Sequence, residues 1–345
     1  MLYALTFMLG LSLALSGVPL ARKAALQFNV VDRPDGRLKR QADPVPYFGG
    51  LAVYLAFLVS LALTFEFRQD VLGLVLGGTL MVMLGLIDDF GVLTPGAKLI
   101  GQLIAVFVLI RSGIRIEIAS FPEWLDLLLT VFWMIGIINA LNIIDVMDGL
   151  AGGVGVMACL WLFVVALLNH DVVSAVMLAA LAGGLIGFLR FNFHPATIYL
   201  GDAGSLFIGF MLGALAMTGQ YAVANPLAVL APVLILAVPI FDTFFVMYIR
   251  WMRGVPVFWG SPDHFALRLR RWPLSVRQVV LISYAVACVC GGVGVLLMFV
   301  SLGVAAGLVG MAAMLALVVA WWLKRVDMST SSSPAQDALL RERTP

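Results

Sequence analysis

Two neighbouring carboxylates, Asp88 and Asp89, end a long apolar stretch of the sequence, and Lys98 follows them. Adjacent carboxylates repel each other unless a cation lies nearby, and hard oxygen ligands suit Mg²⁺, which often shares phosphate oxygens with a substrate. A pair of solvated loop acids is the simpler explanation. Because a carboxylate beside so apolar a stretch is costly without a partner, water or a metal, the position of the pair favours a cation site.

A second cluster repeats an amide or carboxylate side chain at every third position: Asn139, Asn142, Asp145 and Asp148, with Gly149 next. On a helix, this spacing places the four side chains in one slowly drifting polar stripe of an apolar segment. A structural seam between membrane helices would also use polar groups. Four such groups so close together exceed that need, so the stripe indicates a binding site. The glycine permits a tight turn.

A third cluster contains Asn192 and His194 and continues to Gly201, Asp202 and Ser205, before another apolar run. Backbone N–H groups at the start of a helix can bind a phosphate or approach a metal site, and glycine allows the backbone to come close. Asp202 or Ser205 could equally be an ordinary helix cap. We expect His194 to be an interfacial residue, because it precedes a proline in a loop.

Two basic segments, residues 32–40 and 250–277, supply the positive charge that phosphate binding needs. The simplest role of a basic cytoplasmic loop is to set topology and to contact lipid headgroups. The second segment also places Asp263 and His264 close to Arg268, and arginine binds phosphate in a bidentate manner. Together with the acidic clusters, the two segments favour a phosphate-binding face.

The segments that must position these clusters are strongly apolar. Of the 345 residues, 62% are hydrophobic and 12% are charged, and the mean hydropathy is +1.06. A bilayer core of about 30 Å needs ~20 apolar residues for each helical span, so we expect about eleven spans. They lie at residues 1–20, 48–65, 71–87, 98–112, 124–143, 151–169, 172–189, 204–219, 226–249, 278–300 and 302–323.

The predicted fold is therefore an all-α integral membrane protein, a polytopic bundle of about 11 transmembrane helices with cytoplasmic catalytic loops. Residues 1–325 are expected to form a single polytopic transmembrane catalytic domain. Residues 326–345 are polar and are expected to form a cytoplasmic, disordered tail.

Charge asymmetry orients this bundle. If alternate loops lie on opposite sides, one face receives all of the 21 Lys and Arg residues except Arg68, Arg111 and Arg115. The positive-inside rule makes that face cytoplasmic, with the N-terminus outside and the C-terminus inside. Asp242, within the ninth span, either pairs with Lys or Arg of a neighbouring helix or faces a polar cavity. The acids closest to apolar spans all fall at the cytoplasmic face: Asp88, Asp89, Asp145, Asp148, Asp202 and Asp242.

A cytoplasmic face with acids that can hold Mg²⁺, glycine turns and basic loops suits phosphoryl transfer between a soluble phosphate donor and a lipid. A secondary transporter would place its acids near the bilayer midplane and would show paired repeats, which are not evident. A non-catalytic scaffold would not need aspartates sorted to one face. We expect the lipid bilayer as a partner and no nucleic acid.

Five motifs, in order along the chain, resemble those of the polyprenyl-phosphate N-acetylhexosamine-1-phosphate transferases (glycosyltransferase family 4). The motifs are Asp88-Asp89, Asn139-x-x-Asn142-x-x-Asp145-x-x-Asp148-Gly149, Asn192-x-x-Pro195-Ala196, Gly201-Asp202-x-Gly204-Ser205 and Pro239-x-x-Asp242. The resemblance implies transfer of an N-acetylhexosamine 1-phosphate from a UDP-sugar to undecaprenyl phosphate, with release of UMP. It also implies Mg²⁺, with Mn²⁺ as a substitute, the bacterial inner membrane, and the first lipid-diphosphate intermediate of cell-envelope polysaccharide synthesis.

The resemblance also implies roles for single residues. Asp202 is expected to be the principal metal ligand, Asp88 or Asp89 to deprotonate or orient the lipid phosphate, and His264 to act in catalysis. The residues expected to line the site for the nucleotide sugar and its diphosphate are Lys98, Asn139, Asn142, and the catalytic pair Asp145 and Asp148. The other residues expected to bind substrate are Lys39 and Arg268, which would hold phosphates, and Asn192, Gly201 and Asp242.

The sequence departs from the family pattern at two places. Family members usually read Asp-Gly-x-Asp-Gly where this chain has Asp145-Val-Met-Asp148-Gly149, and only His264 precedes the Arg268-Leu269 pair where a histidine-rich stretch is common. The chain also lacks the His-His-His signature of members that use a muramoyl-pentapeptide donor. We therefore expect UDP-N-acetylglucosamine as the donor and direct attack by the lipid phosphate rather than an aspartyl-phosphate intermediate. A homodimer through lipid-facing helices is compatible with the family.

Overall fold

The structure, a computed structural model, describes residues 1–32, 44–65, 69–118, 121–256 and 263–328. These residues form a helical bundle with one short antiparallel strand pair, in which Val31 faces Pro46. The elements are α1 (Leu2–Gln27), β1 (Val31–Asp32), β2 (Val45–Pro46), α2 (Gly49–Thr64), α3 (Gln69–Asp89), α4 (Pro95–Arg111), α5 (Glu123–Ile143), α6 (Leu150–Leu168), α7 (Val172–Asn192), α8 (Gly201–Met217), η1 (Pro226–Leu230), α9 (Ala231–Ile235), α10 (Ala237–Met252), α11 (Phe265–Leu269), α12 (Val276–Leu297) and α13 (Leu302–Lys324).

By length and composition, seven of these helices can cross a membrane: α1, α3, α5, α6, α7, α12 and α13. The helical segment 226–235 and α10 meet at an angle of 77° and would add an eighth span if they are one broken helix. The expected all-α, multi-pass membrane fold is thus confirmed. The remaining expected spans coincide with the shorter helices α2, α4 and α8, so a total of eleven crossings stays a prediction.

Helix α8 lies at the centre of the bundle, where it packs against α2, α3, α5 and α6 and is buried along almost its whole length. Glycines let the neighbouring backbones touch it. A Cβ atom on Gly50 of α2 would lie 2.1 Å from the backbone nitrogen of Gly204, and one on Gly85 of α3 would lie 2.3 Å from that of Ala203. No side chain separates the three backbones here, so the first turn of α8 is tightly fixed.

Local signals start the helices that border the polar clusters. The Thr94 hydroxyl accepts a hydrogen bond from the Ala97 backbone at 3.3 Å, and Pro95 occupies the first helical position of α4. Ser275 and Gln278 form a reciprocal capping box at the start of α12. These caps place Lys98 in the first turn of α4 and Arg277 in the first turn of α12.

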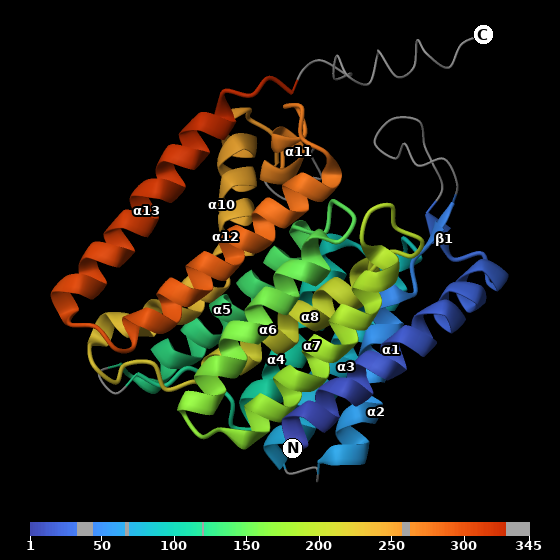
Figure 1. Ribbon diagram of the computed structural model, residues 1–345, viewed down its shortest axis with the longest axis horizontal. Coiled ribbons are helices and arrows are strands. Elements are labelled where there is room, and N and C mark those ends of the chain that lie inside the picture. Colours follow the sequence, from blue (N-terminus) through green and yellow to red (C-terminus); the bar gives the residue numbers. More distant parts are fainter. Residues whose placement is uncertain (33–43, 66–68, 119–120, 257–262, 329–345) are drawn as a thin grey trace.

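Helices α10, α12 and α13 stand to one side of the bundle, and α13 lies along its edge (Figure 1). Only 6% of the apolar part of α13 is buried, against 72% of that of α7, so α13 lies on the surface of the bundle along most of its length. The N-terminus lies at one end of the bundle, whereas the end of α13 lies at the other end with α11 and β1 (Figure 1).

Candidate active site

The first turn of α8 carries Asp202 and is held by the segment that precedes it. The Tyr199 backbone N–H donates to the Pro46 carbonyl at 2.8 Å, and the Gly50 N–H donates to the Leu200 carbonyl at 2.8 Å. Gly201 then adopts a φ of +72°, which an L side chain rarely tolerates. The glycine before Asp202 is therefore needed for the turn that starts the helix.

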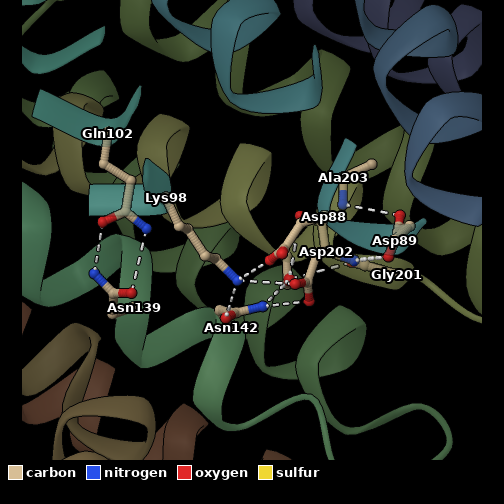
Figure 2. A network of polar contacts seen from close by, with 10 residues as sticks. Asp88, Asp89, Lys98, Gln102, Asn139, Asn142, Gly201, Asp202 and Ala203 are labelled. Atoms are coloured by element: carbon tan, nitrogen blue, oxygen red, sulfur yellow. Dashed lines mark hydrogen bonds and ion pairs between the residues drawn. The ribbon is translucent and has the colours of Figure 1, made fainter. Parts of the chain in front are cut away.

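Asp89, at the end of α3, caps α8 from outside that helix. Its carboxylate oxygens accept hydrogen bonds from the backbone N–H groups of Asp202 at 2.7 Å and Ala203 at 3.3 Å (Figure 2). A carboxylate at this position offsets both the unpaired N–H groups and the positive end of the helix dipole. Asp202 or Ser205 was considered as the residue that caps this helix. Asp89 of α3 caps it instead. The role of Asp89 toward a lipid phosphate stays a prediction.

Lys98 joins the clusters that lie apart in the sequence. Its Nζ lies 2.6 Å from Asp88 Oδ2 and 2.8 Å from Asp202 Oδ2, and it donates to Asn142 Oδ1 at 3.0 Å (Figure 2). The ammonium group offsets the repulsion between the two carboxylates. We call Asp88, Lys98, Asn142 and Asp202 the Lys98 cluster.

Helix α5 supplies the amide side of this cluster. Asn142 Nδ2 donates to Asp202 Oδ1 at 2.7 Å and to Ser205 Oγ at 2.9 Å. One turn earlier, Asn139 and Gln102 exchange two amide hydrogen bonds of 2.9 and 3.2 Å (Figure 2). Both asparagines thus lie on the face of α5 that borders α4 and α8.

The expected helical stripe does not continue to the two aspartates, because α5 ends at Ile143. Asp145 and Asp148 instead lie in the segment between α5 and α6, where Gly149 has a φ of +81°. Within the described residues, the Asp145 carboxylate accepts no hydrogen bond. Burial raises the pKa of Asp145 to about 8, and repulsion from Asp202, Asp89 and Asp148 adds to this effect. A carboxyl group of this kind, in a polar cluster, is a candidate for proton handling or cation binding.

Asp148, unlike Asp145, accepts hydrogen bonds from other described residues. It accepts hydrogen bonds from His194 Nδ1 at 2.7 Å and from the Ala196 N–H at 3.0 Å. Asn192 ties the same two segments together, because it accepts from the Gly149 N–H at 2.9 Å and donates to the Ile198 carbonyl at 3.0 Å. These contacts hold segment 193–200 against the start of α6.

His194, expected to be interfacial only, is partly exposed and also pairs with Asp148. Gln102 and Ser205 are further members of the polar network whose sequence context did not single them out as site residues. His194 and Ser205 both carried a signal, since each belongs to a motif or cluster already identified, whereas Gln102 carried none.

Asp242, His264, Asp263 and Arg268 form a second, buried group, which we call the Arg268 cluster, and the half-exposed Arg253 pairs with its Asp263 at 2.8 Å from outside. Asp242 is fully buried and accepts from His264 Nδ1 at 2.7 Å and from the Phe265 N–H at 2.9 Å. Of the two alternatives for Asp242, a buried pair is present; among the described residues the side chain it pairs with is a histidine just before α11, where a Lys or Arg of a neighbouring helix was expected.

Arg268 connects α11 to the end of α13. Its guanidinium donates to Asp263 Oδ1 at 2.7 Å and to the carbonyls of Leu323 and Val326, each at 3.0 Å. The side chain is 1% exposed. Its donors therefore serve a structural junction, and the expected binding of phosphate by Arg268 stays a prediction.

Two other expectations concern the metal and Lys39. Lys39 lies outside the described residues. Within the described chain, no group of three or more His, Cys, Asp or Glu side chains is arranged to hold a metal ion. The oxygens of Asp88, Asp202 and Asn142 nevertheless converge on the Lys98 ammonium, and carboxylate and amide oxygens are the donors that Mg²⁺ prefers. The donor chemistry fits the ion, and Asp202 as its ligand stays a prediction.

Comparison with known proteins places the chain in a family. Residues 71–220 match the model described as glycosyl transferase family 4. A Bacillus subtilis protein named "Probable undecaprenyl-phosphate N-acetylglucosaminyl 1-phosphate transferase" is 31% identical, over 81% of this chain and 80% of its own length. The decaprenyl-phosphate N-acetylglucosaminephosphotransferase of Mycolicibacterium smegmatis is 32% identical, over 86% of this chain and 82% of its own. The phospho-N-acetylmuramoyl-pentapeptide-transferase of Halalkalibacterium halodurans is 32% identical, over 82% and 92%. The chain belongs to glycosyl transferase family 4.

Proposed function

We propose that this protein transfers N-acetylglucosamine 1-phosphate from a UDP-sugar to a polyprenyl phosphate, undecaprenyl phosphate in the first instance, and releases UMP. The observation that carries the proposal is the Lys98 cluster at the start of α8, in a chain of this family. An ammonium group shared by two carboxylates and an amide can bind a diphosphate and stabilise the charge that develops on it. The nearby carboxyl group of Asp145, which accepts no hydrogen bond from the described residues, adds a further candidate ligand.

The proposed reaction is a direct displacement. A lipid phosphate oxygen forms a bond to the sugar-linked phosphorus, and the bond from that phosphorus to the oxygen of UMP breaks, so UMP leaves with the bonding electron pair. A phosphate monoester has a second pKa near 6 and is mostly doubly charged at pH 7, so its nucleophilic oxygen needs orientation more than deprotonation. We assign orientation of the lipid phosphate to Asp88, which lies at the open end of α3.

Mg²⁺ would be held by Asp202 with Asp88 and the Asn142 amide oxygen, and it would supply charge neutralisation on the diphosphate. We assign binding of the substrate's phosphate oxygens to Lys98, whose ammonium group lies at the centre of the cluster between Asp202 Oδ2 and Asn142 Oδ1. Asn142 fixes the Asp202 carboxylate through a 2.7 Å hydrogen bond, and Asp89 fixes the backbone beneath it.

We further propose that α2, α4, α8 and the bent pair of 226–235 and α10 complete eleven crossings in the bacterial inner membrane. The N-terminus would then lie outside and the C-terminus inside, with the site at the cytoplasmic face. The opposite positions of the N-terminus and the end of α13 support an odd number of crossings (Figure 1). Impermeant labelling of a single cysteine placed at Asp35 or Ser331 should reach each site only from the cytoplasmic side; labelling from outside would overturn this topology.

The test of the function is UMP release by the purified protein with Mg²⁺, undecaprenyl phosphate and a panel of UDP-linked N-acetylhexosamines. We expect release with UDP-N-acetylglucosamine, and none from the Asp202→Ala variant. Glu117→Gln is the matched control, since Glu117 is an exposed acid that pairs with Arg115 away from the cluster. The panel includes a UDP-N-acetylmuramoyl-pentapeptide, because one relative is named for that donor. No release with any donor would overturn the assignment.

A further inference from the structure

A cavity of about 380 Å³ opens where α7 ends and α12 begins. The residues that line it include Arg190, Phe191, Phe193, His194, Thr197 and Arg277. This lining shares no residue with the Lys98 cluster. Arg190, Thr197 and Arg277 are exposed, so the cavity is accessible from the surface.

Positive charge dominates the cavity. Arg190 and Arg277 pair with no carboxylate in the described part of the chain. The Arg190 guanidinium lies 5.9 Å from the centre of the Phe191 ring, and Arg277 Nε donates to the His194 carbonyl at 2.9 Å. At the rim, Arg22 Nε donates to the Thr197 carbonyl at 3.1 Å. The outer nitrogens of Arg22 and Arg277 make no hydrogen bond to the described residues, and the cavity lining contains no acid.

His194 adds a polar group to the cavity wall. Its Nδ1 contacts Asp148 at 2.7 Å, and because an ionised carboxylate can only accept, this nitrogen carries a proton. The contact fixes the ring and leaves Nε2 free of Asp148. The side chain is 42% exposed, so a ligand in the cavity can reach the second nitrogen.

The cavity lies at the level where spans end. Arg22 belongs to α1, Arg190 to the last turn of α7, and Arg277 to the first turn of α12, and all three helices can cross a membrane. Phosphate groups of lipid headgroups occupy this level, and soluble phosphates reach it from the water. Arginine presents a planar fork of donors that matches phosphate oxygens. We propose that this cavity is a phosphate-binding site distinct from the transfer site.

The test compares wild type with the double variant Arg190→Gln/Arg277→Gln. Arg325→Gln is the matched control, because Arg325 is also an exposed arginine at the end of a span and stacks on Trp321 at 3.5 Å. One arm measures the melting temperature in neutral detergent against inorganic phosphate. The other uses native mass spectrometry to compare retention of phosphatidylglycerol and phosphatidylcholine. We expect affinity for at least one phosphate probe to fall about tenfold or more in the double variant and to persist in the control.

The two arms separate the source of the phosphate. Preferential retention of phosphatidylglycerol, with no response to inorganic phosphate, identifies a lipid headgroup, whereas a response to inorganic phosphate identifies a site open to soluble ligands. Equal binding by wild type and double variant, or binding of neither probe by wild type, overturns the proposal. If the double variant does not fold, Arg190→Lys/Arg277→Lys keeps the charge but loses the fork, and a binding constant unchanged from wild type would count against the site. Neither arm uses a UDP-sugar, so the result is independent of transfer activity.

Discussion

The Lys98 cluster and the Arg268 cluster use the same chemical groups, carboxylates paired with a basic side chain, but water reaches them to different extents. The paired side chains of Asp88, Lys98 and Asp202 are between 14% and 33% exposed. In the Arg268 cluster, by contrast, Asp242, Asp263, His264 and Arg268 are at most 7% exposed.

The two clusters also differ in how completely their groups are paired. Arg268 donates to Asp263 and to the carbonyls of Leu323 and Val326 at the end of α13 and just after it. Asp242 accepts from His264 and the Phe265 N–H. Around the Lys98 cluster, carboxylates repel one another, and Asp145 has no hydrogen-bond partner among the described residues. Fully paired buried groups are typical of a structural site, whereas a carboxyl group with a raised pKa beside a partly exposed polar cluster is typical of a functional site.

The largest expected effect is loss of stability in Arg268→Met. The change removes the charged donor of the Leu323 and Val326 carbonyls and one of the two arginines that pair with Asp263, the other being Arg253, so the free energy of unfolding should fall by about 3–5 kcal/mol. Denaturant unfolding in detergent measures this change, with Arg325→Met as the control. Unchanged stability with a raised KM for the UDP-sugar would instead favour a phosphate-binding role for Arg268.

A slightly smaller effect, on activity alone, is expected for Asp202→Asn. Loss of one preorganised charged group at the transferring phosphate should lower kcat for UMP release by about 10²–10³-fold. Stability should change by less than about 1 kcal/mol, because the lost ion pair is partly exposed and a repulsive carboxylate is removed. A large drop in melting temperature with activity retained in the folded fraction would show that the cluster is structural.

A third effect concerns pH and Asp145. With a pKa of about 8, its carboxyl group is mostly protonated at pH 7, and a cation in the Lys98 cluster favours the ionised form. Mg²⁺ binding should therefore release a proton, and affinity should rise with pH up to about 8, by at most about tenfold per unit. Calorimetry in two buffers of different ionisation enthalpy measures the release. Asp145→Asn should abolish it, and an equal release by that variant would assign the proton elsewhere.

The smallest effect should come from the amide pair beside the cluster. Gln102 is buried, and Gln102→Leu leaves Asn139 with one fewer partner, which should cost about 1–2 kcal/mol of stability. The double variant Gln102→Leu/Asn139→Leu should be closer to wild type than either single variant, since both polar groups are gone. Additive losses in this cycle would contradict direct coupling between the two amides.

Much of the fold could be predicted because apolar runs of membrane length have few alternatives to a helix. The expected spans all coincide with helices, yet the sharp bend between segment 226–235 and α10 was not foreseen within the span 226–249. Hydropathy reports how apolar a run is but not where its axis turns. Hydropathy also could not predict which helix lies at the centre of the bundle. Helices α8 and α13 are similarly apolar, yet α8 is buried and α13 is mostly exposed.

For the site, residue types and spacing identified the aspartates but not their partners. Lys98 meets Asp202 across 104 residues of sequence, and His194 meets Asp148 across 46. Such pairs depend on how helices pack, which periodicity within one segment does not record. The end of α5 at Ile143 was another such case, because the turn that follows depends on contacts of Asn192 with Gly149.

The cap that Asp89 places on α8 also bears on motion. Two N–H groups of α8 rest on a carboxylate that belongs to α3, and glycine contacts join the same two backbones. Any tilt of one helix against the other would strain both sets of contacts at once, so the ends of α3 and α8 behave as a single rigid body. Adjustment to a bound substrate then falls to the long Lys98 side chain, while the backbone that carries Asp202 keeps its position.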